Sequence, residues 1–138
     1  MAELEGFKEA ESMLIKLRDL AKEVITIIRD EAYNAHLDMK AIVQVNTKKT
    51  SELIICEDTP DGAKVHSQSE VSQILEYGSV YHDIYPRGPW RLHWVTKSGE
   101  DVYARHVHHP GTRPYPFFHP VRWASTIKIR QRIWEAFK

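Results

Sequence analysis

The sequence predicts an α+β domain in which a largely antiparallel sheet of about four to five strands packs against helices. Three observations predict this class. A long amphipathic helical pattern opens the chain, β-rich segments joined by turn residues fill its middle, and a second helical pattern closes it. Because 138 residues are near the commonest size of one domain, we expect residues 1–138 to form a single domain.

The first helix is predicted from Phe7 to about Ala35. At 1.5 Å per residue it is about 40 Å long, which is more than a small domain covers with its own core. Part of this helix therefore either lies in solvent or packs on a neighbouring subunit. The apolar residues recur at steps of three and four through most of the segment, at Phe7, Ala10, Leu14, Leu17, Ala21, Val24, Ile28 and Ala35.

The β-rich middle of the chain begins after Asp38. The segments MKAIVQVNT (39–47) and SELIICED (51–58) favour a hairpin around the polar residues between them. TPDGA (59–63) is typical of a turn that ends the second strand. EVSQILEYG (70–78) then predicts a short helix stopped by its glycine, and a strand is expected near HDIYP.

A second hairpin is predicted from WRLHWV and VYARHVHH, with Ser98 and Gly99 as a two-residue turn. This turn places His93 opposite Ala104. Alternation along the strands then produces one apolar face and one polar face that holds three imidazoles. The apolar face consists of Trp90, Leu92, Trp94, Tyr103 and Val107, and the polar face of Arg91, His93, His106 and His108.

Three histidines on one face raise the alternative of a zinc site, or of a small metal-dependent hydrolase or nuclease that uses His93, His106 and His108. Arg91 brings positive charge to the same face, and no Asp, Glu or Cys of that face balances it. The spacing also matches no zinc signature. We therefore expect no metal, no cofactor and no catalytic residue here, and we interpret the histidines as an exposed or inter-subunit polar face.

The sequence does not support nucleophilic catalysis any better than it supports a metal site. Cys56, the single cysteine, excludes an internal disulfide and lies in an apolar segment, where a thiol is usually inert. Ser79 follows Gly78 but lacks the flanking pattern of a nucleophile elbow. We expect the protein not to be an enzyme.

The last helix is predicted to start at Pro120 and to reach Phe137. It is basic, which either complements the helix dipole or, as an alternative function, contacts DNA. The chain as a whole is neutral, with 19 Lys plus Arg and 19 Asp plus Glu, so DNA binding needs a local patch. The basic residues of the helix are Arg122, Lys128, Arg130 and Arg132.

Targeting signals are absent from the sequence pattern. The N-terminal segment MAELEGFKEAES is acidic where a signal peptide is basic and then apolar, and no apolar segment reaches the length that spans a membrane. We expect a soluble protein that folds in the cytoplasm where it is made.

A series of short motifs begins at Ile74. It consists of an acid-aromatic-Gly step in ILEYGS, an Ile-x-Pro strand, a Leu-centred strand, the turn VHHPGT and a Pro-Phe pair before the last helix. In order and spacing this series resembles the head-tail joining or tail-completion family of long-tailed bacteriophages, over roughly a third of the chain. The matching residues are Glu76, Tyr77, Gly78, Ile84, Pro86, Leu92, Val107, His109, Pro110, Gly111, Thr112, Pro116 and Phe117.

The resemblance implies a structural virion protein of the phage neck or tail top, without catalytic activity or cofactor. It implies a homo-oligomeric ring, six-fold in symmetry, assembled in the host bacterial cytoplasm. Its partners would be the head connector or stopper and the tail tube or tail terminator proteins, with passing contact to DNA in the channel and none to a membrane. We expect Leu14 and Leu17 of the long helix, and the aromatic strap VHHPGTRPYPFFHP (107–120) that includes Phe117, to form the ring interface.

Overall fold

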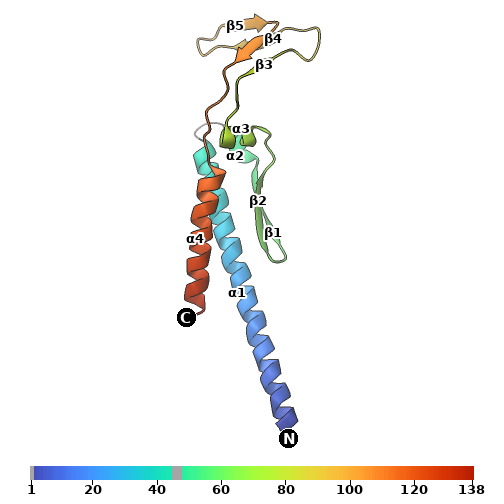
Figure 1. Ribbon diagram of the computed structural model, residues 1–138, viewed down its shortest axis with the longest axis vertical. Helices are drawn as coiled ribbons and strands as arrows, with labels where there is room; N and C mark the ends of the chain where they lie inside the picture. Colours follow the sequence, from blue (N-terminus) through green and yellow to red (C-terminus); the bar gives the residue numbers. More distant parts are fainter. Residues whose placement is uncertain (1, 45–47) are drawn as a thin grey trace. The chain divides into compact units, whose positions relative to one another are not determined.

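A computed structural model of the protein describes residues 2–44 and 48–138. It confirms a mixed class of helices and antiparallel strands (Figure 1). The chain divides into two compact units, which we call unit 1 (Met1–Ser72 with Phe117–Lys138) and unit 2 (Gln73–Pro116). The elements are α1 (Ala2–Gln44), α2 (Lys48–Glu52), β1 (Ile54–Thr59), β2 (Gly62–Ser67), α3 (Val71–Tyr77), β3 (His82–Ile84), β4 (Leu92–Val95), β5 (Asp101–Ala104), β6 (Val107–His109) and α4 (Phe118–Ala136).

The prediction of one sheet with four to five strands is wrong. In the described residues the strands form three separate two-stranded antiparallel sheets, β1–β2, β3–β6 and β4–β5. The strands of unit 2 are only three or four residues long. Pro86 and Pro89 separate β3 from β4, and proline cannot donate a ladder hydrogen bond. That the whole chain behaves as one domain stays a prediction.

The predicted first helix is confirmed and is longer than expected at both ends. Its buried positions recur every fourth residue and continue past Ala35 through Met39 and Val43. The segment 39–44 is therefore helical, and its prediction as a strand is wrong. The remainder of that predicted strand, residues 45–47, lies outside the described residues.

The first hairpin of the structure is β1–β2, so the predicted pairing of SELIICED with the preceding segment is also wrong. Thr59 pairs with Gly62 across the turn, which makes TPDG the hairpin connection. Arg29 of α1 holds this turn. Its Nη2 donates to the Thr59 carbonyl oxygen at 2.6 Å, and its Nε donates to that of Gly62 at 3.1 Å.

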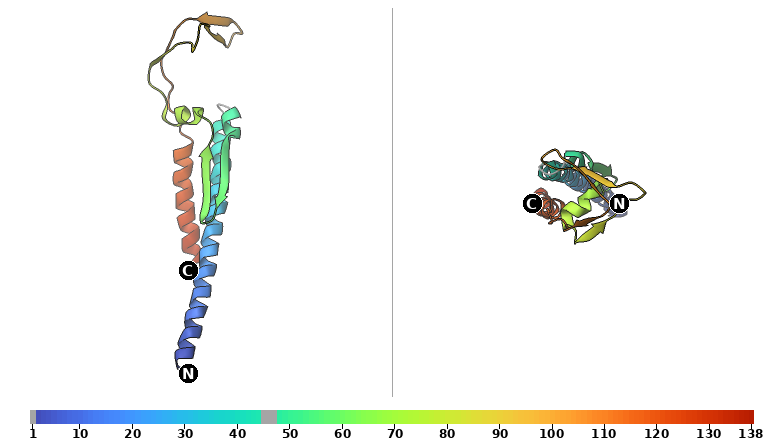
Figure 2. Two further views of the ribbon diagram at one scale, coloured as in Figure 1. Left: turned by 90° about the vertical axis from the view of Figure 1, so that its right-hand side faces the viewer. Right: turned by 90° about the horizontal axis from the view of Figure 1, so that it is seen from above.

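The core of unit 1 lies where α1, α4 and the β1–β2 hairpin meet. Figure 1 shows α4 beside the C-terminal half of α1, and Figure 2 shows the hairpin alongside the same half. The core consists of buried apolar side chains, of which the larger ones (Val, Ile, Met and Phe) contribute about 1.5–3 kcal/mol each relative to exposure. The buried side chains of the core are Ile27, Ala35, Met39, Val43, Ile54, Phe117 and Val121.

The N-terminal half of α1 has no such cover within unit 1. The whole of α1 has 43 residues and is about 65 Å long. In its N-terminal half, every side chain from Glu5 to Asp19 is exposed. Leu14 and Leu17 are 67% and 55% exposed. The structure therefore leaves an apolar stripe in solvent over several turns of this helix.

Unit 2 contrasts with unit 1 because none of its described apolar side chains is fully buried. Isolated two-stranded sheets are marginally stable in water, so such a unit needs another source of stability. Among the described residues, no helix is both long enough and apolar enough to cross a membrane.

Candidate functional site

The motif residues meet in unit 2 around one backbone bridge, Ser79 to Thr112. The two flanking motif glycines have positive φ, 75° at Gly78 and 93° at Gly111. A Cβ on Gly78 would lie 2.5 Å from the carbonyl oxygen of Thr112, and one on Gly111 would approach that of Ser79 even more closely. Both positions therefore require glycine for backbone angle and for space.

The short helix before this bridge was predicted correctly. α3 is followed by Gly78, whose N–H donates to the carbonyl oxygen of Ile74 at 2.8 Å, as expected of a glycine that ends a helix. Two residues earlier, Glu76 is buried, whereas Tyr77 is 68% exposed.

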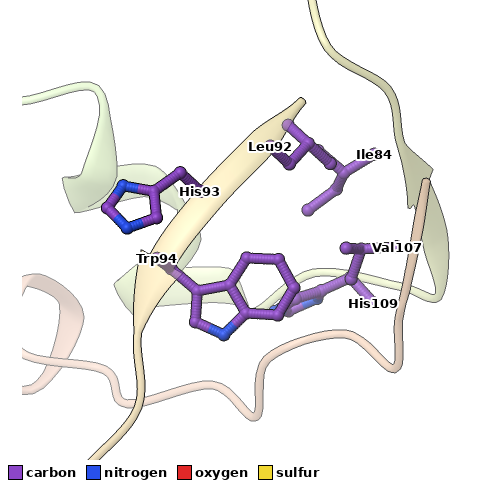
Figure 3. Close-up of a pocket in the computed structure, with 6 residues that line it drawn as sticks. All are labelled: Ile84, Leu92, His93, Trp94, Val107 and His109. Atoms are coloured by element: carbon purple, nitrogen blue, oxygen red, sulfur yellow. The ribbon is translucent and has the colours of Figure 1, made fainter. Parts of the chain in front are cut away.

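Four motif residues line one apolar pocket of about 400 Å³ in unit 2. Ile84 of β3 pairs with Val107 of β6, and Leu92 and Trp94 of β4 face them across the pocket (Figure 3). His109 lies at the same pocket, whereas the ring of His93 points away from it (Figure 3). The Ile-x-Pro strand, the Leu-centred strand and the VHHPGT turn therefore form one surface.

Other motif residues do not line this pocket. Pro86, which follows β3, is half-buried, and Pro110 and Pro116 are exposed. Phe117 is the most deeply buried aromatic side chain of unit 1, at 1% exposure. Phe117 was expected at the ring interface, but this burial places its side chain in the core of unit 1 instead.

The register predicted for the second hairpin is wrong by one residue. Thr96, not Lys97, closes the turn: its N–H donates to the Glu100 carbonyl oxygen at 2.9 Å, so three residues form the loop. His93 consequently pairs with Tyr103, on which it stacks at 4.6 Å, instead of with Ala104. A slip of one residue reverses which side chains share a face.

The predicted group of three histidines is divided by this pairing. His93 contacts Asp101 of β5, with 2.7 Å between Nε2 and Oδ1. His106 and His108 lie beside Asp83, because β6 pairs with β3 and does not extend β5. The expectation of no metal depended on the absence of an acidic side chain beside the histidines, but Asp83 lies beside His106 and His108. The alternative site of His93, His106 and His108 is not formed, because His93 contacts Asp101.

Asp83, His106 and His108 form a compact cluster, which we call the β3–β6 cluster. The Asp83 Oδ1 lies 2.5 Å from Nδ1 of His108 and 3.3 Å from Nε2 of His106. The two imidazole rings are 4.1 Å apart and nearly perpendicular. One ligand atom from each residue can be chosen so that all three lie within 4.8 Å.

Electrostatics in the cluster favour an ionised carboxylate. The hydrogen bond from His108 lowers the pKa of Asp83 below its ordinary value, and the charges of His108 and His106 lower it further. Sequence reasoning missed Asp83, although its alternation with Tyr81 and Tyr85 placed all three on one face of the strand.

The residues considered for nucleophilic catalysis are in unfavourable surroundings. Burial raises the pKa of the Cys56 thiol, and the charges of Asp58 and Glu57 raise it further, so the reactive thiolate is disfavoured. The Ser79 hydroxyl oxygen accepts a hydrogen bond from the Thr112 N–H at 3.0 Å and therefore supports the bridge.

The basic last helix is partly neutralised within unit 1. Arg132 donates from Nη1 to Oε1 of the buried Glu31 at 3.0 Å and from Nη2 to Oδ2 of Asp30 at 3.3 Å. The hydrogen bond to Glu31, followed by that to Asp30, raises the pKa of Arg132 above its ordinary value. Exposed side chains remain on α4, among them Arg122, Lys128 and Arg130.

Comparisons with known proteins leave the chain without a match among family models, curated proteins or solved structures.

Proposed function

We propose that the protein is a structural virion component of the phage neck or tail top, acting as one subunit of a ring that joins the head connector to the tail tube. The observation that carries this proposal is the meeting of the motif residues in unit 2. Gly78, Gly111 and Thr112 surround one bridge, and Ile84 and Val107 pair beside it.

The exposed apolar surface supports an assembling subunit over a free monomer. Unit 2 leaves Trp90 and Val80 at least 80% exposed, and its pocket is lined by apolar motif residues. The apolar stripe of α1 at Leu14 and Leu17 adds a second uncovered surface. Large exposed apolar patches are typical of protein interfaces, whose buried centres are enriched in aromatic residues.

A ring gives these surfaces a use that a two-fold dimer does not. In a ring, each subunit presents one surface to the neighbour on one side and a different surface to the neighbour on the other. Under the proposal, the α1 stripe and the exposed apolar surface of unit 2 at Trp90 and Val80 are both interface surfaces of the ring. Six-fold symmetry of the ring would match the symmetry of the tail components that it is proposed to contact.

DNA binding by α4 is the weaker alternative. Arg132 is engaged by Glu31 and Asp30, and the net charge of the chain is zero. Any DNA contact made by the exposed Arg122, Lys128 and Arg130 fits a passing role in the channel of a ring better than tight binding.

The position of the protein in a tailed particle tests the proposal. The chain, fused to a compact label at its C-terminus, is expected to appear by electron microscopy as one ring of density between head and tail. Particles made without the protein should accumulate as separate heads and tails. Intact infectious particles without the protein, or label found elsewhere on the particle, would show that the proposed role is wrong.

A further inference from the structure

We propose that the β3–β6 cluster binds a divalent transition-metal ion, with zinc as the best fit. The ligands are the carboxylate of Asp83 and the imidazoles of His106 and His108. This site lies outside the proposed ring function, and its role is to link the two short strands of a unit that has no buried apolar core of its own.

Strand pairing places all three ligands on one face. Asp83 pairs directly with His108 in the antiparallel register, and such partners point to the same side. His106 is two residues before His108 and shares that side by alternation. The opposite side of the ribbon carries Ile84 and Val107, which line the apolar pocket, so the cluster is a distinct polar surface.

The distances are close to those of a bound metal. Ligand atoms placed 2.0–2.1 Å from a tetrahedral zinc ion lie about 3.3 Å from one another. Asp83 Oδ1 is already 3.3 Å from His106 Nε2. The 2.5 Å contact with His108 Nδ1 needs only a small opening to admit the ion.

One nitrogen of the cluster, Nε2 of His106, lies 3.3 Å from Oδ1 of Asp83 but makes no hydrogen bond with it. Nε2 of His106 is buried and makes no hydrogen bond with any residue that the structure describes. Leaving a buried polar atom unsatisfied is unfavourable, whereas a metal ion would use its lone pair. His106 is also fixed in orientation, because Tyr85 stacks on its ring at 4.5 Å.

Tyr81 completes the surroundings of the site. Its hydroxyl oxygen lies 2.6 Å from Nδ1 of His108 and donates to Oδ1 of Asp83 at 3.3 Å. It is therefore placed to orient the carboxylate or a metal-bound water at the fourth position. Two imidazoles and one carboxylate favour zinc, cobalt, nickel or copper over magnesium and calcium, which prefer oxygen ligands.

The test uses the full chain, expressed without a polyhistidine tag and freed of metal by chelation. Titration with zinc chloride, followed by calorimetry, should give one ion per chain, and cobalt chloride should produce the visible absorption of a low-symmetry site. Zinc should also raise the melting temperature, because it binds the folded state. Chelator should reverse that rise.

Variants assign the site. Asp83→Asn, His106→Gln and His108→Gln should each weaken zinc binding more than tenfold, whereas His93→Gln is the matched control and should leave the affinity unchanged. Circular dichroism checks the fold of each variant. If the unmodified chain binds neither zinc nor cobalt at millimolar concentrations, the proposal is wrong. It is equally wrong if His93→Gln abolishes binding while Asp83→Asn and His106→Gln retain it.

Discussion

Ser79 and Thr112 exchange backbone hydrogen bonds in both directions across 33 residues of sequence. The Ser79 N–H donates to the Thr112 carbonyl oxygen at 2.9 Å, and the Thr112 N–H donates back to that of Ser79 at 3.0 Å. This reciprocal pair brings Gly78 and Gly111 to the same point in unit 2. It explains physically why two glycines occur in the motif series.

Replacement of Gly111 should therefore destabilise unit 2. Gly111→Ala introduces a side chain at a positive φ and against the Ser79 carbonyl oxygen, which should cost about 1–3 kcal/mol. The matched control is Gly99→Ala, which has φ of 85° but no atom near the added Cβ. Urea unfolding followed by tryptophan fluorescence, with Trp123 and Trp134 of unit 1 replaced by Phe in both variants, reports on unit 2 through Trp90 and Trp94. Equal stability of the two variants would show that the close approach is unimportant.

Loss of Arg132 should weaken the packing of α4 on α1. Arg132→Met leaves the buried carboxylate of Glu31 without its cation, so the melting temperature should fall. Arg130→Met removes the same charge from an exposed position of α4 and should have little effect. The double variant Arg132→Met with Glu31→Met should recover part of the loss. If Arg132→Met has the same melting temperature as the parent protein, the ion pair of Arg132 with Glu31 contributes nothing measurable to stability.

Acid should destabilise the metal-free protein partly through Asp83. Its pKa is lowered in the folded state from an ordinary value of 3.8, so the unfolded state takes up the proton first as pH falls. The contribution to stability is complete above that ordinary value and disappears as pH falls through the folded-state pKa. Asp83→Asn should lose less stability than the parent between pH 6 and pH 2. Parallel stability curves for the two proteins over this range would contradict the assignment.

The sequence predicts the helices well because their signals are local. Gly78 ends α3 as expected, and the four-residue spacing of Ala35, Met39 and Val43 is visible in the sequence. The β-branched residues of 39–47 favour a strand, but burial of Met39 and Val43 on the helix face outweighs that propensity.

The candidate site was not predictable to the same degree, because it depends on non-local pairing. One extra residue in the β4–β5 loop changed the register and moved His93 to Asp101. Asp83 and His108 are 25 residues apart, and no local sequence pattern predicts that β6 pairs with β3. That the motif residues form the series of one family stays a prediction, and the bridge around which Gly78, Gly111 and Thr112 meet required the structure.

Assembly of the ring through the α1 stripe is the central claim, and charge on that stripe tests it most directly. Leu14→Glu and Leu17→Glu should fold normally by circular dichroism, because both side chains are exposed in the isolated subunit. In complementation of particles that lack the protein, each variant should reduce incorporation by about tenfold or more, since the proposed interface would have to bury a charge. Lys16→Glu, on the same turns of α1 but away from the stripe, should be incorporated normally. If the two leucine variants fold and assemble into infectious particles as efficiently as Lys16→Glu, α1 forms no essential interface and this account of the ring is wrong.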